Sequence, residues 1–337
     1  MRIALFGVGH WHSAMHLDAA QAARADVVGV WDENPDVAAE FARAHGQTHL
    51  PTIEAGLAQA PDVVVLMGHP ATLPAQAERL IAAKVPLILE KPVGDIDTIA
   101  RLADQARAGG CHVAVPLANR FGPAQGELAR LAEISRAGRL VRAGFRLVNG
   151  PPQRYRDDGV GWLLDPAVGG GGALRNLGIH GIDAALDLAE GPLTILSSSV
   201  GNLIHATDVE DHALVVMRDA AGTLFTVEAG YTFASMRPGG EFEWRLVSAN
   251  ATLTDLGDSA TVATLDDNQM RNLRPEPTAT RYRLFMADAL ARLGQGRPPS
   301  VSLDDYLAAM RLIDAAYLAA GRNTDGTIAT TPGKDKT

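Results

Sequence analysis

Ile3-Ala4-Leu5-Phe6-Gly7-Val8-Gly9 opens the chain with a short apolar run that ends at two closely spaced glycines. A run of this length, bounded by glycine, is typical of a buried strand in a parallel sheet. Helix-type periodicity then follows over Ser13–Ala23. A strand, a glycine turn and a helix in this order predict the first unit of an α/β domain.

The same alternation of apolar runs and helical patterns continues through the first third of the chain. The further strands expected are Val27–Trp31, Val63–Met67, Leu87–Leu89 and Val113–Val115, and the further helices are Asp36–Ala44, Leu73–Ala83 and Ile96–Ala108. Successive βαβ units with right-handed crossovers place their strands in one parallel sheet. We therefore predict a doubly wound domain over residues 1–120.

The pattern changes after residue 120 to successive β-runs separated by turn residues. The strands expected there are Arg142–Val148, Ile195–Val200, His212–Arg218, Thr223–Tyr231, Phe242–Ser248 and Ala260–Leu265, and the helices are Pro123–Ala137, Leu174–Leu188, Thr280–Leu293 and Leu303–Ala320. This order predicts a second, α+β domain over 121–322 with a large, mostly antiparallel open sheet. Residues 323–337 have few apolar side chains, and we expect them to be disordered.

Composition narrows the class of protein. The 337 residues are 47% hydrophobic, carry a net charge of −9 and include one cysteine. The negative charge disfavours a nucleic-acid partner, and a single cysteine fits a reducing compartment. The N-terminus reaches Gly7 too soon for the apolar core of a signal peptide, and we see no apolar run long enough to cross a membrane. We expect a cytoplasmic protein.

Gly7 and Gly9 allow a pyrophosphate to approach backbone N–H groups where a helix begins. His12 stands where the motif Gly-x-Gly-x-x-Gly has its third glycine, so the glycines alone are weak evidence. Asp32, however, ends the second expected strand, where a carboxylate accepts hydrogen bonds from the adenosine ribose. We therefore predict a dinucleotide site, and favour NAD because a carboxylate repels the 2′-phosphate of NADP.

His10-Trp11-His12 and His16 also have spacings found in metal sites. No acidic ligand motif accompanies them, and the same turn is already required by the dinucleotide. We therefore expect no metal, and we expect His10, Trp11 and His12 to lie along the cofactor loop.

Glu90-Lys91-Pro92 directly follows the apolar run Val85–Leu89. The C-terminal ends of such strands are where open α/β sheets place their chemistry. Pro92 blocks the start of a helix and favours an extended backbone at Lys91. A lysine held there can polarise a substrate oxygen; the plainer interpretation is a solvated lysine at a strand end.

The segment Gly169–His180 combines four successive glycines with a helix that carries Asn176 and His180. It lacks the Lys-Ser/Thr of a nucleoside-triphosphate loop. Residues four apart share one helix face, so these two side chains can reach one ligand. Histidine exchanges protons near neutral pH, although a structural or capping role is the alternative.

These motifs, with Trp162-Leu163-Leu164-Asp165-Pro166 and Ser302-Leu303-Asp304-Asp305, occur in the order that resembles the glucose–fructose oxidoreductase/inositol dehydrogenase/rhizopine-catabolism (Gfo/Idh/MocA) family. The resemblance covers nearly the whole chain. It implies an N-terminal Rossmann domain, a C-terminal domain whose open sheet often forms oligomer contacts, and NAD(P)-dependent hydride transfer involving a sugar, cyclitol or related polyol.

The resemblance also assigns roles to residues. Lys91 takes the place of the lysine near the substrate hydroxyl and nicotinamide, with Glu90 beside the cofactor, and His180 that of the proton-exchanging histidine. Asn176 stands where the family usually has Asp, so it can orient groups but supplies no negative charge. Further candidates for substrate contact are Arg120, Arg154, Tyr155 and Trp162.

Two other functions fit the same motifs. NAD-dependent glycosidases resemble this family and use a transient oxidation, so they form no net NADH. A nicotinamide-binding regulatory protein without turnover is supported only by Asn176 and opposed by Lys91 and His180. The open sheet needs a cover that the expected helices do not provide, so we predict a homodimer or homotetramer.

Overall fold

The computed structural model describes residues 1–322, which divide into two compact units. One unit combines Met1–Gly122 with Glu276–Ala308, and the other combines Pro123–Pro275 with the residues from Ala309 onward. This division differs from the expected one, which gave all of 121–322 to the second domain. The reason is tertiary packing: a late helix contacts the first helix of the chain. The expectation of disorder over 323–337 lies outside the described residues.

The first unit contains a five-stranded parallel sheet in the order β2-β1-β3-β4-β5, as the alternating sequence pattern predicts. Its strands are β1 (Arg2–Phe6), β2 (Asp26–Trp31), β3 (Val63–Leu66), β4 (Leu87–Leu89) and β5 (Val113–Ala114). The strands β3 and β4 are buried at every position, so their continuous apolar runs reflect a sheet covered on both faces. The strand order reverses beside β1, and this is the point at which such folds bind ligands.

Local capping marks the ends of some helices of this unit. They are α1 (Ser13–Ala22), α2 (Pro35–His45), α3 (Ile53–Leu57), α4 (Leu73–Ala82) and α5 (Ile96–Gly109). Side chains of Asn34 and Asp95 accept from the backbone at the starts of α2 and α5, and left-handed Gly46 and Gly110 end them. The short α3 was not predicted, because five residues show too little periodicity.

Two later segments complete the first unit. Helix α10 (Thr278–Gly294) packs against α1 and against the 3₁₀ turn η1 (Ala118–Phe121). The chain then pairs with the end of the sheet, where Val115 N–H donates to the Val301 carbonyl at 3.0 Å. Helix α11 (Leu303–Ala319) follows, and its residues from Ala309 onward belong to the second unit.

The second unit contains an eight-stranded sheet in the order β13-β12-β11-β10-β6-β9-β8-β7. Only β6 and β9 pair in parallel, so the prediction of a mostly antiparallel sheet is confirmed. The strands are β6 (Leu140–Asn149), β7 (Thr194–Gly201), β8 (His212–Arg218), β9 (Leu224–Gly230), β10 (Gly240–Ser248), β11 (Ala251–Asp255), β12 (Ala260–Thr264) and β13 (Met270–Leu273).

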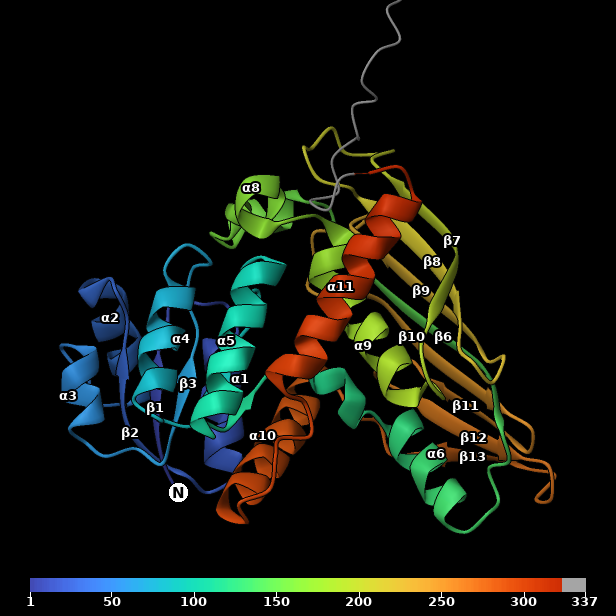
Figure 1. Cartoon of the computed structure of the whole chain (residues 1–337), viewed down its shortest axis with the longest axis horizontal. Helices are drawn as coiled ribbons and strands as arrows, with labels where there is room; N and C mark the ends of the chain where they lie inside the picture. The colour runs from blue at the N-terminus through green and yellow to red at the C-terminus, as the bar shows by residue number, and fades with distance from the viewer. Residues whose placement is uncertain (323–337) are drawn as a thin grey trace, which may run out of the picture. The chain divides into compact units, whose positions relative to one another are not determined.

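One face of this sheet packs against helices and forms the core of the unit. Figure 1 shows α6 (Pro123–Glu133) and α9 (Ile179–Leu188) on that face. The buried ring of Trp244 lies edge-on to Phe145 with 4.7 Å between their centroids. The connections between β6 and α9 contain the short helices α7 (Gln153–Asp157) and α8 (Pro166–Gly169), the 3₁₀ turn η2 (Gly161–Leu164) and the π-helical turn η3 (Leu174–Gly178).

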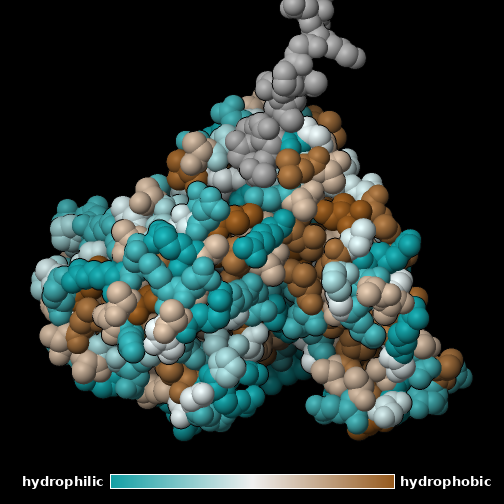
Figure 2. Space-filling model, viewed as in Figure 1, coloured by the Kyte–Doolittle hydropathy of each residue, from teal (hydrophilic) through white to brown (hydrophobic). Residues whose placement is uncertain are grey.

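Hydrophilic side chains cover most of the face of the first unit that Figure 2 shows. Among the described residues, no helix is both long and apolar enough to span a membrane.

Candidate functional site

The turn after β1 requires glycine at position 7 and brings Gly9 close to Asp32. Gly7 has a positive φ of 79°, and a Cβ atom there would lie 2.0 Å from the Met67 carbonyl oxygen. The N–H of Gly9 donates to Oδ2 of Asp32 at 2.7 Å, and a Cβ on Gly9 would approach that oxygen to 3.1 Å. The backbone at Gly9 therefore lies directly against the Asp32 carboxylate.

Asp32 directly follows β2, and its Oδ1 accepts from the Asn34 N–H at 2.9 Å. The structure thus brings together Gly7, Gly9 and Asp32 at the carboxyl ends of the neighbouring strands β1 and β2. This is the arrangement in which a dinucleotide lays its pyrophosphate on the glycine turn and its ribose on the carboxylate. The residues fit the group that the sequence predicts.

A buried cluster surrounds the side chain of Glu90, which has no solvent exposure. Its Oε1 accepts from the Lys91 N–H at 3.0 Å, and its Oε2 lies 2.7 Å from His16 Nε2. Two more groups approach Oε2: His12 Nδ1 at 3.3 Å and the hydroxyl of Tyr282 at 3.5 Å. The same hydroxyl lies 2.9 Å from His12 Nδ1. Sequence reasoning missed Tyr282, because only the packing of α10 on α1 brings it here.

Burial and neighbouring charges set the protonation of this cluster. Burial would raise the pKa of Glu90, but His12 and His16 lie against it and leave that pKa well below its usual value. Burial lowers the pKa of His12, and lowers that of His10 well below the ordinary histidine value. Burial also lowers the pKa of Lys91, while the Glu90 carboxylate raises it. We infer an ionised Glu90 near neutral His10 and His12 rings, beside a lysine that holds its proton less firmly than a surface lysine does.

His10, His12 and Glu90 also offer three ligand atoms within 4.8 Å of one another. Most of this donor set is already hydrogen-bonded, since His10 Nδ1 accepts from the His12 N–H at 3.2 Å and Glu90 is bound as described above. Trp11 stacks on the His10 ring with 3.9 Å between centroids. The sequence offered no acidic partner for these histidines; the fold supplies Glu90.

In the second unit, Glu210 holds the glycine-rich segment in place. Its buried carboxylate accepts from the Gly172 N–H at 2.8 Å, the Leu174 N–H at 2.9 Å and the Tyr317 hydroxyl at 2.8 Å. A Cβ on Gly172 would lie 2.2 Å from the Glu210 carbonyl oxygen, so only glycine fits. Burial raises the pKa of Glu210. No sequence signal pointed to this residue.

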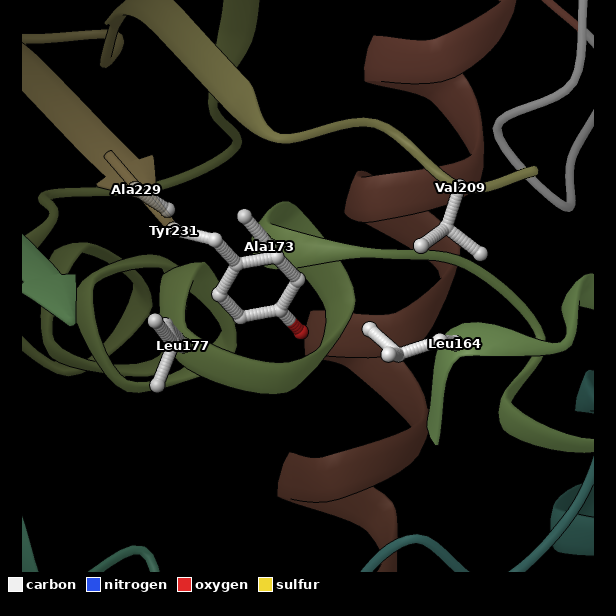
Figure 3. Close-up of a cluster of buried hydrophobic side chains, with 6 residues drawn as sticks. All are labelled: Leu164, Ala173, Leu177, Val209, Ala229 and Tyr231. Carbon is white, nitrogen blue, oxygen red and sulfur yellow. The ribbon is translucent and has the colours of Figure 1, made fainter. Parts of the chain in front are cut away.

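Asn176 lies on the π-helical turn that follows, and its side chain is buried. Its Nδ2 donates to the hydroxyl of Tyr231 at 3.1 Å. The Tyr231 ring packs 5.0 Å from that of Tyr155, whose hydroxyl accepts from Asn149 Nδ2 at 3.1 Å. Figure 3 shows Tyr231 within the buried apolar cluster of Leu164, Ala173, Leu177, Val209 and Ala229. Asn176 therefore donates a hydrogen bond to one member of a tyrosine pair. The sequence analysis named Tyr155 of this pair but not Tyr231.

His180 is half-buried in the first turn of α9. The expected single helix over Leu174–Leu188 is thus a π-helical turn joined to an α-helix. Gly178 ends the π-helical turn, and a Cβ there would lie 2.7 Å from Leu174 Cδ1. Turns of this kind often occur at functional sites. Asn176 and His180 accordingly flank the junction between the two helical segments.

The remaining candidates are fixed in different surroundings. Arg120 donates to the Ser300 carbonyl at 3.2 Å and to Asp305 at 3.4 Å, both within the first unit. Arg154 donates to the Gly239 carbonyl at 3.0 Å, and Trp162 is half-buried in η2.

Comparison with known proteins identifies both parts of the chain. Residues 1–116 match the model described as oxidoreductase family, NAD-binding Rossmann fold, and residues 127–254 match that of the GFO/IDH/MocA C-terminal domain. No curated protein sequence matches the chain.

Solved structures similar to the chain include three that cover nearly all of it. UDP-N-acetylglucosamine 3-dehydrogenase GnnA from Acidithiobacillus ferrooxidans is 20% identical, with a TM-score of 0.77 over 96% of this chain and 98% of that one. Levoglucosan dehydrogenase in complex with NADH and levoglucosan is 20% identical, with a TM-score of 0.81 over 95% and 97%. An oxidoreductase from Agrobacterium radiobacter in complex with NAD⁺, L-tartaric acid and magnesium is 18% identical, with a TM-score of 0.81 over 95% and 96%.

At these identities the solved structures establish the fold alone, while the two family models establish descent. The first matches the unit that contains Gly7, Gly9 and Asp32, and the second spans the segment that contains Asn176 and His180. The chain is a member of the Gfo/Idh/MocA family of oxidoreductases, with an NAD-binding Rossmann domain at its N-terminus.

Proposed function

We propose that the protein is an NAD-dependent dehydrogenase that acts on a secondary alcohol of a sugar, cyclitol or related polyol. The observation that carries the proposal is the joint placement of Gly7, Gly9 and Asp32 at one sheet edge, in the unit that also buries Lys91. The family membership supports redox chemistry at a nicotinamide.

Gly7, Gly9 and Asp32 would hold the dinucleotide, with His10, Trp11 and His12 along the same loop. When bound, NAD⁺ supplies the acceptor for a hydride. Residues of the protein must then stabilise the substrate oxygen, which gains negative charge as its proton leaves. The buried Lys91 ammonium is suited to stabilising that charge, because its interactions are strongest where water is excluded.

We assign to His180 the exchange of the proton of the substrate hydroxyl. In the oxidation direction its imidazole accepts this proton, and in reduction it returns the proton to the oxygen. Asn176 orients the substrate or the imidazole through hydrogen bonds. Its Nδ2 also donates to the Tyr231 hydroxyl, which holds the amide in place.

Two kinds of observation support the substrate class. Tyr155 and Trp162 offer rings of the kind that pack on sugar faces, and Arg120 and Arg154 offer hydrogen-bond donors. Two of the similar structures carry names that specify a nucleotide sugar and an anhydrosugar. A sugar or polyol is therefore the class to test first.

An NAD⁺-reduction screen over aldoses, inositols and anhydrosugars tests the proposal. We expect NADH to accumulate in proportion to the substrate oxidised. If a glycoside is cleaved with no net NADH, the transient-oxidation mechanism replaces the proposal. NAD binding without turnover of any of these substrates would favour a regulatory protein.

Cofactor choice gives the first prediction. NAD should bind at least tenfold more tightly than NADP, equivalent to about 1.4 kcal/mol, because Asp32 repels a 2′-phosphate. Asp32→Ala should reduce this difference in affinity, mainly by weakening the binding of NAD. Calorimetric titration of both cofactors measures this, and the neighbouring Glu33→Ala serves as a matched carboxylate control. Equal dissociation constants for the wild type would refute the assignment.

The outer face of the eight-stranded sheet is the surface where we expect subunits of an oligomer to meet. The helices α6 and α9 pack on the other face, and the outer face carries mixed charges with some apolar side chains. There Arg146 pairs with Glu228 at 2.8 Å, and Leu214 is 38% exposed. The depression they border has a volume of about 220 Å³ and is also lined by Arg142, Gly144, Thr226, Glu243 and Arg245. Such a face gains stability when a second copy covers it.

We therefore predict a homodimer or homotetramer in solution. Light scattering at micromolar concentration should give a multiple of 35.5 kDa. Leu214→Arg should shift the population towards monomer, whereas Leu203→Arg, at a leucine that is 84% exposed outside this face, should not. A wild-type monomer would contradict the prediction.

A further inference from the structure

The four glycines at 169–172 lead into a site that a carboxylate of the protein itself occupies. Three successive backbone N–H groups donate to Glu210: those of Gly172 and Leu174 to its carboxylate at 2.8 and 2.9 Å, and that of Ala173 to its carbonyl oxygen at 3.2 Å. A Cβ atom on Gly172 would lie 2.8 Å from Oε2 of Glu210. Backbone N–H groups that converge in this way form an anion site. In this protein Glu210, and not a ligand, provides the anion.

The same carboxylate caps the helical segment that follows. The first N–H groups of a helix have no partner within it, and Ala173, at the start of η3, has no side chain that could accept from them. Glu210 supplies both the acceptors and a negative charge at this end, where the helix dipole favours one. The N–H of Asn176 then donates to the Gly172 carbonyl at 3.0 Å. Glu210 therefore determines where the segment that carries Asn176 and His180 begins.

Glu210 is itself held by its neighbours on both sides in the sequence. Figure 3 shows Val209 in the same buried apolar cluster as Ala173. Asp211 is fully buried, and its carboxylate accepts from three successive N–H groups of the preceding loop at 3.0, 2.7 and 2.8 Å. The hydroxyl of the buried Tyr317 donates to Glu210 Oε1 at 2.8 Å. The position of the Glu210 carboxylate is therefore set by the fold before any ligand binds.

Helix α11 provides a second attachment, through the part of it that belongs to the second unit. Arg175, which directly precedes Asn176, is buried and forms an ion pair with Asp314. The Arg175 guanidinium also lies over the ring of Tyr317, 5.7 Å from its centroid. A Cβ atom on Gly171 would lie 2.5 Å from the Tyr317 hydroxyl, so a side chain there would displace this hydroxyl. Polar contacts from α11 and from the loop before β8 thus hold the turn that carries Asn176.

We propose that Glu210 is a positioning residue for the hydride transfer: it fixes the start of the helical segment so that Asn176 and His180 meet the substrate in one geometry. The inference rests on the proposed function, in which His180 exchanges a proton and Asn176 orients the reacting groups. Glu210 acts only through the backbone of residues 172–174. Catalysis is sensitive to such placement, because a shift of about 1 Å in a reacting group can lower the rate about 10²-fold.

Glu210→Gln tests this role, because it keeps the shape of the side chain. Its oxygen can still accept from Leu174 and Tyr317, but its amide NH₂ group would face the N–H of Gly172, a donor against a donor. The start of the segment should therefore loosen. On a verified substrate we expect kcat to fall by about 10- to 100-fold. KM for NAD should stay within a few-fold of wild type, because the residues that would hold the dinucleotide lie in the other unit.

Hydrogen exchange measured by mass spectrometry reports the same change without any substrate. Peptides that cover residues 172–180 should exchange about tenfold faster in Glu210→Gln, since their first N–H groups lose an acceptor. Peptides from β8 and β9 should keep wild-type rates, which excludes general unfolding. Tyr317→Phe removes one of the three side-chain hydrogen bonds of the carboxylate and keeps its charge. It should cause a smaller change in the same peptides, and it carries the test if Glu210→Gln does not fold.

Asp219→Asn is the matched control for an effect on stability alone. Asp219 is also buried in the second unit, and its carboxylate likewise accepts from two backbone N–H groups, those of Glu190 and Thr223 at 3.0 and 2.8 Å. This variant should melt at a lower temperature yet keep wild-type kcat and wild-type exchange over 172–180. An equal loss of kcat in Asp219→Asn would overturn the proposal, as would faster exchange in Glu210→Gln with kcat unchanged.

The two measurements also separate this proposal from the proposed function. If the wild type turns over no sugar or polyol while exchange over 172–180 is faster in Glu210→Gln, the proposed function fails and Glu210 remains the residue that fixes Asn176 and His180. If the wild type is active and exchange is unchanged in both Glu210→Gln and Tyr317→Phe, the positioning role alone fails.

Discussion

His180→Ala should lower kcat by about 10² to 10⁴-fold, the usual cost of losing a general acid–base group. NAD affinity should stay within a few-fold of wild type, because the glycine turn and Asp32 lie in the other unit. Fluorescence titration of NADH and steady-state kinetics on a verified substrate measure the two effects. The half-buried His112, which the proposal does not use, provides the control as His112→Ala.

The pH dependence of kcat distinguishes proton exchange from a structural role. Oxidation requires a neutral imidazole, so activity should rise with pH while His180 loses its proton, and this rise should vanish in His180→Ala. Near-full activity of the variant would refute the role. Loss of NAD binding or of the thermal transition would show that His180 is structural.

Asn176→Asp is the companion measurement, since it restores the usual family residue at nearly constant volume. The new carboxylate would accept from the Tyr231 hydroxyl that now accepts from Asn176. A carboxylate near an imidazole favours the protonated form, so the rise in activity should move to higher pH. A profile identical to wild type would mean that residue 176 does not influence His180.

The sequence was sufficient for features encoded by neighbouring residues. Apolar runs and glycine turns predicted the parallel sheet, because fully buried strands such as β3 contain little else. The pair of Gly9 and Asp32 could be predicted because both sit at strand ends whose spacing is set by one βαβ unit. Lys91 was found for the same reason, as it follows a buried strand directly.

Features that depend on tertiary packing could not be predicted. Tyr282 reaches Glu90 from a helix nearly two hundred residues later, and nothing in its own segment indicates the contact. Glu210 likewise binds the N–H of Gly172 from a loop between strands. The strands β11 and β13 were missed because the first has one large apolar residue, Leu253, and the second is an exposed edge strand. Edge strands resemble loops in composition.

Lys91→Ala should reduce turnover about as much as His180→Ala, by about 10² to 10⁴-fold, with NAD affinity within a few-fold of wild type. Lys91→Met is the sharper variant, because it removes the charge and retains most of the buried apolar stem. Lys84→Met is the matched control, since Lys84 is the only other lysine among residues 1–322 and is exposed. Steady-state kinetics should show that Lys91→Met loses turnover while Lys84→Met keeps it.

Stability should change in the opposite direction to activity. Burial places the folded-state pKa of Lys91 below its unfolded value, so the protonated lysine destabilises the fold at neutral pH, and this cost disappears only as pH rises through that range. Removing the charge should therefore leave the melting temperature of Lys91→Met at or above that of wild type. A variant that melts no lower yet turns over at least a hundredfold more slowly would identify Lys91 as a residue kept for chemistry. A variant that keeps its activity would show that the lysine has no part in the reaction.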